Sequence, residues 1–270
     1  MNVEESLQAG RLDEALGCAR EVVRKSPADS RPRILLFQLL SVVGSWEKAV
    51  TQLSVLRDMD PDSMLLAEIF RPVIQCEALR AEIFAGKRSP IIFGEPEEWM
   101  GLLVQANQLV ANGNFKTAGE IRDRAFEAAP AVSGKINGKP FEWIADADTR
   151  LGPMLEAIIS GKYFWVPFGR IQSAVVEAPT DLRDLVWISA RIIWANGGNS
   201  PAFIPVRYPG SETSGDSALQ LARKTEWQVE DAGTYLGLGQ RLLATDQEEI
   251  PLLETRTLEF ETAPVPVEET

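Results

Sequence analysis

Small, apolar and helix-breaking residues recur in a fixed order three times in the first half of the chain. Each copy has a Gly, an apolar residue two positions later, an Ala five positions later and a Pro seventeen positions later. The copies are Gly10, Leu12, Ala15 and Pro27; Gly44, Trp46, Ala49 and Pro61; and Gly113, Phe115, Ala118 and Pro130. The first two copies lie 34 residues apart, which is the period of a tetratricopeptide helix pair. The pattern therefore predicts tetratricopeptide-like helix pairs.

The spacing within each copy has a physical explanation. Gly and Ala let two helices cross closely, and Pro ends a helix because it has no amide hydrogen. Seven residues after each Ala comes another apolar residue, Val22, Leu56 or Ala125. Seven residues are two helical turns, so we expect both members of each pair to face one neighbouring helix. The alternative is an ordinary helical domain in which Gly and Pro occupy these positions by chance.

The centre of the helical half is less regular. The third copy lies 69 residues after the second, which is one residue more than two periods. We expect a degenerate helical unit over residues 64–98, and Pro72, Pro90 and Pro96 indicate that it is irregular.

The pattern changes near residue 132. Residues 133–140 contain Gly, Lys and Pro and are expected to form a linker or turn. One helix is expected from Thr149 to Ile159, with Asp146 or Asp148 as its N-cap and Gly161 at its end. Short runs rich in aromatic and β-branched residues, separated by Gly-, Pro- and Asn-rich turns, are typical of β-strands. These runs span residues 163–166, 171–176, 185–194, 202–206, 227–229 and 252–260.

Together these patterns predict a two-domain α+β protein. Residues 1–132 are expected to form an all-α domain of tetratricopeptide-like repeats. Residues 133–262 are expected to form a small α+β domain with a curved sheet or an SH3-like barrel, because several short strands at this spacing suggest either. Residues 263–270 are expected to be a flexible tail.

Charge narrows the range of partners. The net charge is −12, and residues 136–270 contain 11 Lys and Arg against 20 Asp and Glu. An acidic surface argues against nucleic acid and against anionic membranes, which both attract basic residues. We find no signal peptide and no apolar stretch long enough to span a membrane, and Cys18 and Cys76 are too few for a disulfide scaffold. The expected compartment is the cytoplasm.

Few residues suggest catalysis. The chain has no His, which removes the commonest general base and most zinc sites, and no Walker-type phosphate loop. Asp146 and Asp148 could together hold a divalent cation, so a metal-dependent enzyme is one alternative. We favour a capping and ion-pair role for both acids, with Arg150 and Arg183 as partners. No cofactor is expected.

A series of short motifs resembles one known family. In order along the chain the motifs are FEWIADADTRLGP (141–153), YFWVPF (163–168), DLRDLVW (181–187), WANGG (194–198), IPVRYPGSE (204–212), TEW (225–227) and GLGQR (237–241). Each motif is weak alone, but their ordered sum resembles the ImpE family, also called TagJ or SciE-type, of type VI secretion accessory proteins. The resemblance covers nearly the whole chain, and the helical repeats are its least distinctive part.

The resemblance implies a cytoplasmic, non-enzymatic accessory factor. Family members are described as binding the small sheath subunit, TssB, through an N-terminal helix of that subunit, with a link to the ClpV-type ATPase. An amphipathic helix can place its apolar face in a groove between repeat helices. We place this groove at the irregular centre, lined by Phe70, Ile74, Phe84, Phe93, Trp99 and Leu103, although aromatic residues at helical spacing usually pack internally. A general peptide-binding repeat adaptor remains a second alternative.

Overall fold

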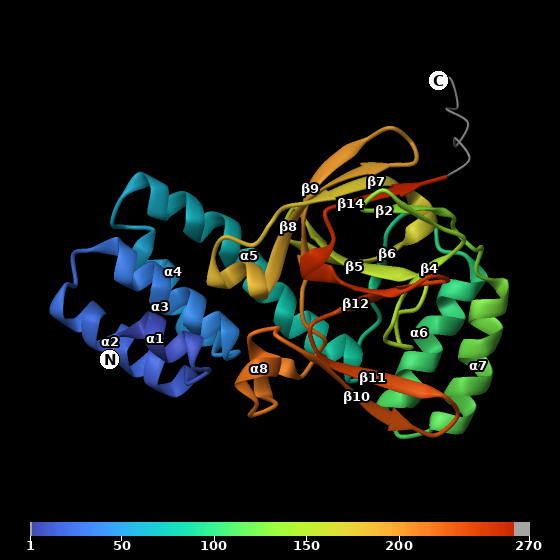
Figure 1. Cartoon of the computed structure of the whole chain (residues 1–270), viewed down its shortest axis with the longest axis horizontal. Coiled ribbons are helices and arrows are strands. Elements are labelled where there is room, and N and C mark those ends of the chain that lie inside the picture. Colours follow the sequence, from blue (N-terminus) through green and yellow to red (C-terminus); the bar gives the residue numbers. More distant parts are fainter. Residues whose placement is uncertain (1, 262–270) are drawn as a thin grey trace.

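The computed structural model describes residues 2–261 and has an α+β architecture, with helices first and strands after them (Figure 1). The helices of the first half are α1 Val3–Gln8, α2 Leu12–Lys25, α3 Ser30–Val42, α4 Trp46–Leu56, α5 Pro61–Phe84, α6 Glu98–Ala111 and α7 Phe115–Ala128. The short strand β1 Ile91–Ile92 lies between α5 and α6. The predicted α+β class is confirmed. The predicted tail lies outside the described residues.

Strands dominate the second half. They are β2 Gly134–Ile136, β3 Lys139–Phe141, β4 Ile144–Asp146, β5 Met154–Ile159, β6 Lys162–Pro167, β7 Ile171–Val176, β8 Trp187–Trp194, β9 Asn199–Pro205, β10 Thr225–Glu230, β11 Thr234–Gly239, β12 Leu242–Thr245, β13 Glu249–Pro251 and β14 Thr257–Phe260. Short helical turns interrupt them: η1 Phe168–Arg170, η2 Leu182–Leu185, η3 Ser211–Thr213, α8 Ser217–Gln220 and η4 Leu252–Glu254.

The repeated Gly has a different role from the one that the sequence suggested. Gly10, Gly44 and Gly113 each join two helices and have positive φ angles of 71°, 65° and 74°. An L-residue pays a steric cost in this left-handed conformation, so the turn itself requires Gly. The three repeated Ala residues are fully buried in α2, α4 and α7, as a close helix crossing requires.

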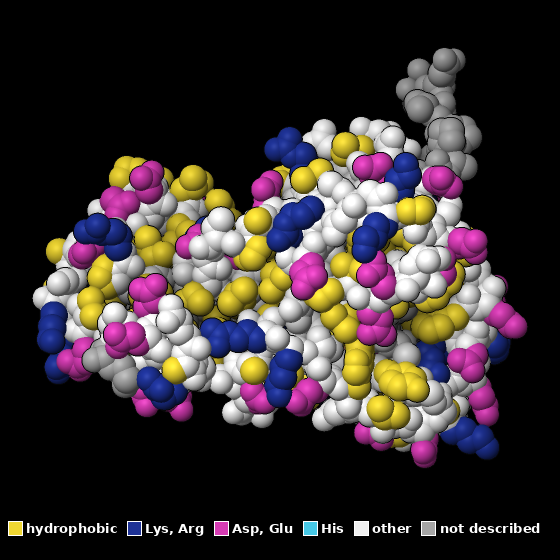
Figure 2. Space-filling model, viewed as in Figure 1, with side chains coloured by type: hydrophobic (Ala, Val, Ile, Leu, Met, Phe, Trp, Pro, Cys, Tyr) yellow, Lys and Arg dark blue, Asp and Glu magenta, His cyan; other side chains and the backbone are white. Residues whose placement is uncertain are grey.

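The irregular centre is one long helix. α5 has 24 residues and contains Pro72 in its interior. The exposed face of its first half carries Met64, Leu65 and Ile69, where hydrophobic side chains gather at the upper left of Figure 2. α5 then runs from the other N-terminal helices to the sheet (Figure 1), where it contacts β6.

The main sheet is open. Its nine strands follow the order β1-β6-β5-β9-β8-β7-β14-β2-β3, so β1 and β3 are its edges and the SH3-like barrel is not confirmed. Separate sheets contain β13-β12-β4 and the hairpin β10-β11. In the middle of the main sheet, β5 and β9 pair at one position only, Ile158 with Phe203.

Two local predictions are wrong. Residues 154–159 form strand β5 rather than part of a helix, and all six residues are buried. A strand covered on both faces has no alternation of polar residues, so its apolar run resembles a buried helix. Residues 133–140, expected to form a linker or turn, contribute most of the hairpin β2-β3, and only residues 137–138 form a turn. Asn137 and Gly138 have φ angles of 50° and 79°, as its tight turn requires.

The core is shared between the two halves of the chain. One hydrophobic cluster joins α1–α6 and Ala125 of α7 to Met154, Ile158, Trp165 and Trp187. A second cluster contains other residues of β5, β6 and β8 together with residues from the rest of the sheet, and it includes Phe168, Ile192 and Leu258. The division into domains at residue 132 therefore stays a prediction. Among residues 2–261, no helix has the length and apolarity needed to cross a bilayer.

Candidate protein-binding site

Five of the six residues predicted to line a groove are buried in the first hydrophobic cluster: Phe70, Ile74, Phe84, Trp99 and Leu103. Phe93 is partly buried against the second cluster and stacks on Trp194 with ring centroids 4.0 Å apart. Phe70 packs 5.2 Å from the ring of Phe203, and Phe84 packs 5.8 Å from that of Trp165. These contacts place them between helices and sheet, and their role in partner binding stays a prediction.

A buried ionic network links α5 to the sheet. Arg80 Nε donates to Glu156 Oε1 at 2.5 Å, and Arg80 Nη2 donates to Glu156 Oε2 at 2.9 Å. Tyr163 Oη and Arg241 Nη2 also donate to this carboxylate. Burial raises the pKa of Glu156, but the Arg80 and Arg241 charges outweigh it and hold the pKa at about 2, against an ordinary 4.5. Glu156 is therefore an ionised anchor between the helices and the sheet.

The two acids proposed for a metal site are occupied by protein donors. Asp146 accepts from Arg241 and from Tyr208 Oη, the latter at 3.1 Å. Asp148 accepts from Arg150 Nε at 2.8 Å and from the Gly237 amide at 2.8 Å. Within residues 2–261, no group of three or more His, Cys, Asp or Glu side chains is placed to hold a metal ion.

Of the two arginines predicted to pair with these acids, one does so. The ion pair between Arg150 and Asp148 is confirmed. Arg183 instead pairs with Asp181 at 2.6 Å and with Asp184 at 3.6 Å, so its predicted pairing is wrong. Within the described residues, neither Asp146 nor Asp148 caps a helix here, because residues 149–153 form turns that lead into β5. Arg183 pairs locally because it lies in η2, where Asp181 and Asp184 are its near neighbours in the sequence.

Arg207 attaches the helical half to the second half of the chain. Its Nη1 donates to the carbonyl of Val42, the last residue of α3, at 2.6 Å, and to the carbonyl of Gln220 in α8 at 2.5 Å. A cation at a helix C-terminus compensates the unpaired carbonyls there. Burial lowers the pKa of Arg207 to about 10.

A large open cavity lies along α2. We call it the α2 groove, and its volume is about 1050 Å³. Its floor is one face of α2, at positions 14, 17, 18, 21, 22 and 25; its walls come from α1, α3 and the start of η2. Its lining consists of Asn2, Val3, Glu4, Leu7, Glu14, Gly17, Cys18, Glu21, Val22, Lys25, Leu35, Gln38, Thr180, Asp181 and Leu182.

The wall from η2 is held in place by several contacts. Gln38 Nε2 donates to Asp181 Oδ1 at 3.3 Å, and the amides of Thr180 and Asp181 both donate to Asp184 at 2.8 Å. The Arg183 guanidinium lies 5.1 Å from the ring centroid of Phe70. The α2 groove is therefore a fixed feature built from segments about 140 residues apart.

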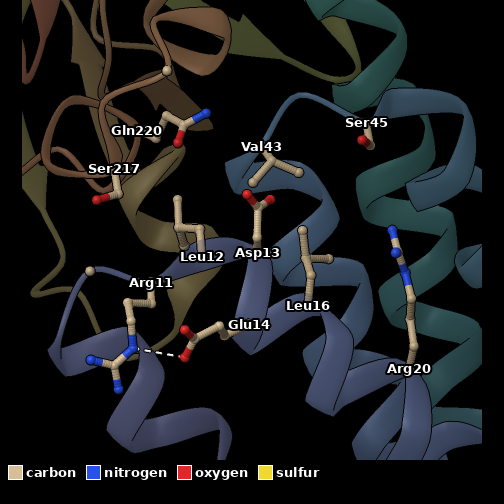
Figure 3. A pocket seen from close by; sticks show the side chains of 12 residues that line it. Arg11, Leu12, Asp13, Glu14, Leu16, Arg20, Val43, Ser45, Ser217 and Gln220 are labelled. Atoms are coloured by element: carbon tan, nitrogen blue, oxygen red, sulfur yellow. Dashed lines mark hydrogen bonds and ion pairs between the residues drawn. The ribbon is translucent and has the colours of Figure 1, made fainter.

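Other cavities are smaller or more polar. On another face of α2, a pocket of about 640 Å³ lies between the α1–α2 turn, the α3–α4 turn and α8. In Figure 3, Asp13 and Leu16 of α2 face this space, Ser217 and Gln220 lie across it, and Arg11 pairs with Glu14. A third cavity, of about 520 Å³, lies between α5 and strands β5, β8 and β9. The α2 groove is the candidate site because it combines size with apolar side chains from several elements, which are Val3, Leu7, Val22, Leu35 and Leu182.

Comparisons with known proteins identify the family. The model of the ImpE protein family matches residues 138–259. The type VI secretion system accessory component TagJ of Pseudomonas aeruginosa is 49% identical over 261 residues, covering 97% of this chain and 92% of the relative. The chain belongs to the ImpE/TagJ family. It is therefore related to accessory components of type VI secretion, as the motifs predicted.

A solved structure of similar shape supports the fold along the whole length. The crystal structure of the protein VPA1032 from Vibrio parahaemolyticus is 25% identical and has a TM-score of 0.86. The match covers 97% of this chain and 98% of that chain. The ImpE/TagJ family model thus matches the strand-rich half, whereas both whole-chain comparisons also include the helices that form the α2 groove.

Sequence reasoning missed the α2 groove of this ImpE/TagJ protein, although one signal was present. Val22 follows Ala15 by seven residues and was expected to face the same neighbour. Ala15 is buried, but Val22 is 43% exposed on the floor of the groove. An apolar position on a repeat helix that no neighbouring helix covers is such a signal. The wall from η2 has no sequence signal, because only the fold brings it to α2.

Proposed function

We propose that this protein is a non-catalytic adaptor of the type VI secretion system that binds the small sheath subunit. In this proposal, the partner presents its N-terminal segment as an amphipathic helix, and the α2 groove receives the apolar face of that helix. The α2 groove is the observation that carries the proposal, because it is open, about 1050 Å³ in volume and lined in part by apolar side chains of α1, α2, α3 and η2. The family membership supplies the secretion context.

The spacing of the floor supports a helical ligand. Positions 14, 17, 18, 21, 22 and 25 of α2 repeat at intervals of three and four residues and so form one continuous helix face. An amphipathic helix that lies in a groove presents its own anchors at the same intervals. Leu35 of α3 and Leu182 of η2 would contact it from the two sides.

The proposal includes the finer parts of the sequence interpretation. The helix pairs are tetratricopeptide-like repeats, the ClpV-type ATPase is a further partner, and the protein works in the cytoplasm without binding nucleic acid or inserting into membranes. The net charge of −12 supports the exclusion of nucleic acid. The pairing of Asp146 and Asp148 with arginines supports a role without metal catalysis.

Isothermal titration with a synthetic peptide of the sheath subunit's N-terminal helix tests the proposal. Two helical glycines provide a matched comparison, because a Cβ atom added at Gly17 of α2 or Gly101 of α6 meets no atom within 4 Å. Gly17→Phe fills the groove, whereas Gly101→Phe places the same ring elsewhere. Replacing Gly inside a helix favours the helix, so both variants should fold. We expect micromolar binding and a negative heat-capacity change for the wild type and Gly101→Phe. Gly17→Phe should bind at least about tenfold more weakly, a loss of about 1.4 kcal/mol.

The two cysteines give a second readout. Cys18 lies on the floor of the groove, so bound peptide should slow its alkylation. Cys76 is the internal control, because burial raises the pKa of its thiol to about 12 and leaves little reactive thiolate. Failure of the peptide to bind at high micromolar concentration would refute the proposal. Tight binding that leaves Cys18 alkylation unchanged would place the peptide elsewhere.

A further inference from the structure

The polar lining of the α2 groove is strongly biased toward acids. Four carboxylates line it, and we call these the acidic rim: Glu4, Glu14, Glu21 and Asp181. The one basic residue in the lining is Lys25, at the C-terminal end of α2. A groove that combines apolar side chains with four carboxylates does not suit every amphipathic helix equally, because like charges at close range repel.

The acids of the rim can exchange their present partners. Glu14 pairs with Arg11 at 2.7 Å, Glu21 with Arg24 at 2.6 Å and Asp181 with Arg183 at 2.6 Å. Glu4 has no ion pair among the described residues. The first two pairs are well exposed, and exposed ion pairs are weak because water screens them. A bound ligand with its own cations can therefore take over these carboxylates.

We propose that the α2 groove selects an amphipathic helix with Lys or Arg on both margins of its apolar stripe. This inference rests on the proposed function, since it assigns a charge pattern to the helix that the groove receives. Charge complementarity is its basis: Glu4 lies on the α1 wall, Glu14 and Glu21 lie on α2, and Asp181 lies on the η2 wall. A ligand helix thus meets carboxylates along both margins.

The groove also gives the ligand a preferred direction. Glu14 and Lys25 are eleven residues apart on α2, which is roughly 16 Å along the helix axis. Basic residues of the ligand belong near Glu14, and any acidic residue belongs near Lys25. The span corresponds to about three turns of a bound helix.

Two synthetic probes test the charge pattern directly. Both are 18-residue helices with the same Leu stripe at i, i+3, i+4 and i+7; one carries Lys at all flanking positions and the other carries Glu. Binding is measured by fluorescence anisotropy at about 0.15 M salt, where long-range attraction is screened. We expect the Leu/Lys helix to bind the wild-type protein at least tenfold more tightly than the Leu/Glu helix, and Gly17→Phe to abolish this binding.

A control is needed because the whole protein is acidic and attracts any cation. The rim variant is Glu4→Lys with Glu21→Lys. The control variant is Glu230→Lys with Glu249→Lys, which changes the net charge by the same amount at exposed acids of β10 and β13. We expect the rim variant to lose most of the preference for the Leu/Lys helix and the control variant to keep it.

The outcomes separate this inference from the proposed function. Equal losses in the rim and control variants would overturn the inference, because overall charge would then explain the preference. If Gly17→Phe weakens binding of the sheath-subunit peptide but the rim variant does not, the inference fails and the proposed function stands. If that peptide does not bind while the Leu/Lys helix shows the expected pattern, the proposed function fails and the charge selectivity of the groove stands.

Discussion

Glu156 is the residue on which the contact between helices and sheet depends most. Its carboxylate accepts from Arg80, Arg241 and Tyr163 in a fully buried position, so its charge is compensated only while all three donors stay in place. Removing one member of a buried ion pair leaves the other charge unpaired in a region of low polarity, which is far more costly than the intact pair.

Glu156→Gln should therefore lower the free energy of unfolding by about 3–5 kcal/mol at pH 7. The folded-state pKa of Glu156, about 2, lies below its ordinary value of 4.5. The unfolded chain thus binds the proton first, and the stabilisation is present above pH 4.5 and lost as the pH falls toward 2. The difference in free energy of unfolding between wild type and Glu156→Gln should shrink by roughly 3 kcal/mol as the pH falls over that range. Urea unfolding at pH 7, 4 and 3 measures it.

Glu77 provides the control at the same interface. It accepts from Trp187 Nε1 at 2.6 Å, but burial raises its pKa above the ordinary 4.5. The pH dependence of Glu77 therefore has the opposite sign. Its contribution to the free energy of unfolding is present below the ordinary pKa of 4.5 and is lost as the pH rises through the pKa of the folded state. The gap between wild type and Glu77→Gln should therefore narrow as the pH rises. The same pH trend in both variants would contradict the role given to the arginine pair.

At the scale of elements, the most clearly conformation-dependent position of the repeat is the Gly in the turn between paired helices. Gly10, Gly44 and Gly113 occupy one motif position and one backbone conformation, yet their surroundings differ. A Cβ atom at Gly44 would lie 2.5 Å from Cγ of Glu212, whereas one at Gly113 would meet nothing within 4 Å. Equivalent residues of the repeat therefore differ in what they contact in the second half of the chain.

Gly44→Ala should be more destabilising than Gly113→Ala. Both variants pay the left-handed backbone cost of about 1–2 kcal/mol. Only Gly44→Ala must also displace Glu212, so we expect it to lower the free energy of unfolding by roughly 1 kcal/mol more. Thermal and urea unfolding of the two variants measure the difference. Equal losses would mean that the contact between this turn and Glu212 contributes nothing to stability.

Helices were more predictable than strands for a physical reason. The Gly, Ala and Pro positions constrain a helix pair locally, so sequence alone placed α2, α4 and α7. Strand β5 is covered on both faces and therefore has no alternating pattern. The β2-β3 hairpin has a usable signal in Asn137-Gly138, a typical hairpin turn, but the sequence pattern predicts a linker or turn over residues 133–140 without the flanking strands. The α2 groove was less predictable still, because its wall at Asp181 and Leu182 joins α2 only through the fold.

At the scale of the whole molecule, the hydrophobic core extends across the domain boundary predicted near residue 132. The first hydrophobic cluster includes both helical residues and residues of β5, β6 and β8. The Arg80–Glu156 pair and the Arg207–Val42 hydrogen bond cross the same boundary. Helices and sheet are thus expected to unfold together, since neither side can bury its apolar surface alone.

A fragment of residues 1–132 should therefore fold poorly. It would expose Phe70, Phe84 and Trp99, which are buried against the sheet side of the cluster in the full chain. We expect strong binding of a hydrophobic dye and loss of a cooperative thermal transition, while the full chain shows one transition. A fragment that unfolds cooperatively and binds little dye would instead support two independent domains.

The single pairing of Ile158 with Phe203 has a mechanical consequence. β5 pairs with β6 at six positions and β9 pairs with β8 at seven, but β5 and β9 pair at one. Under a pulling force, the sheet should separate along this line before it separates elsewhere. The helices bridge this line, because Arg80 of α5 donates to Glu156 of β5 while Glu77 of α5 accepts from Trp187 of β8, so the helical layer rather than the strand ladder should resist such a force.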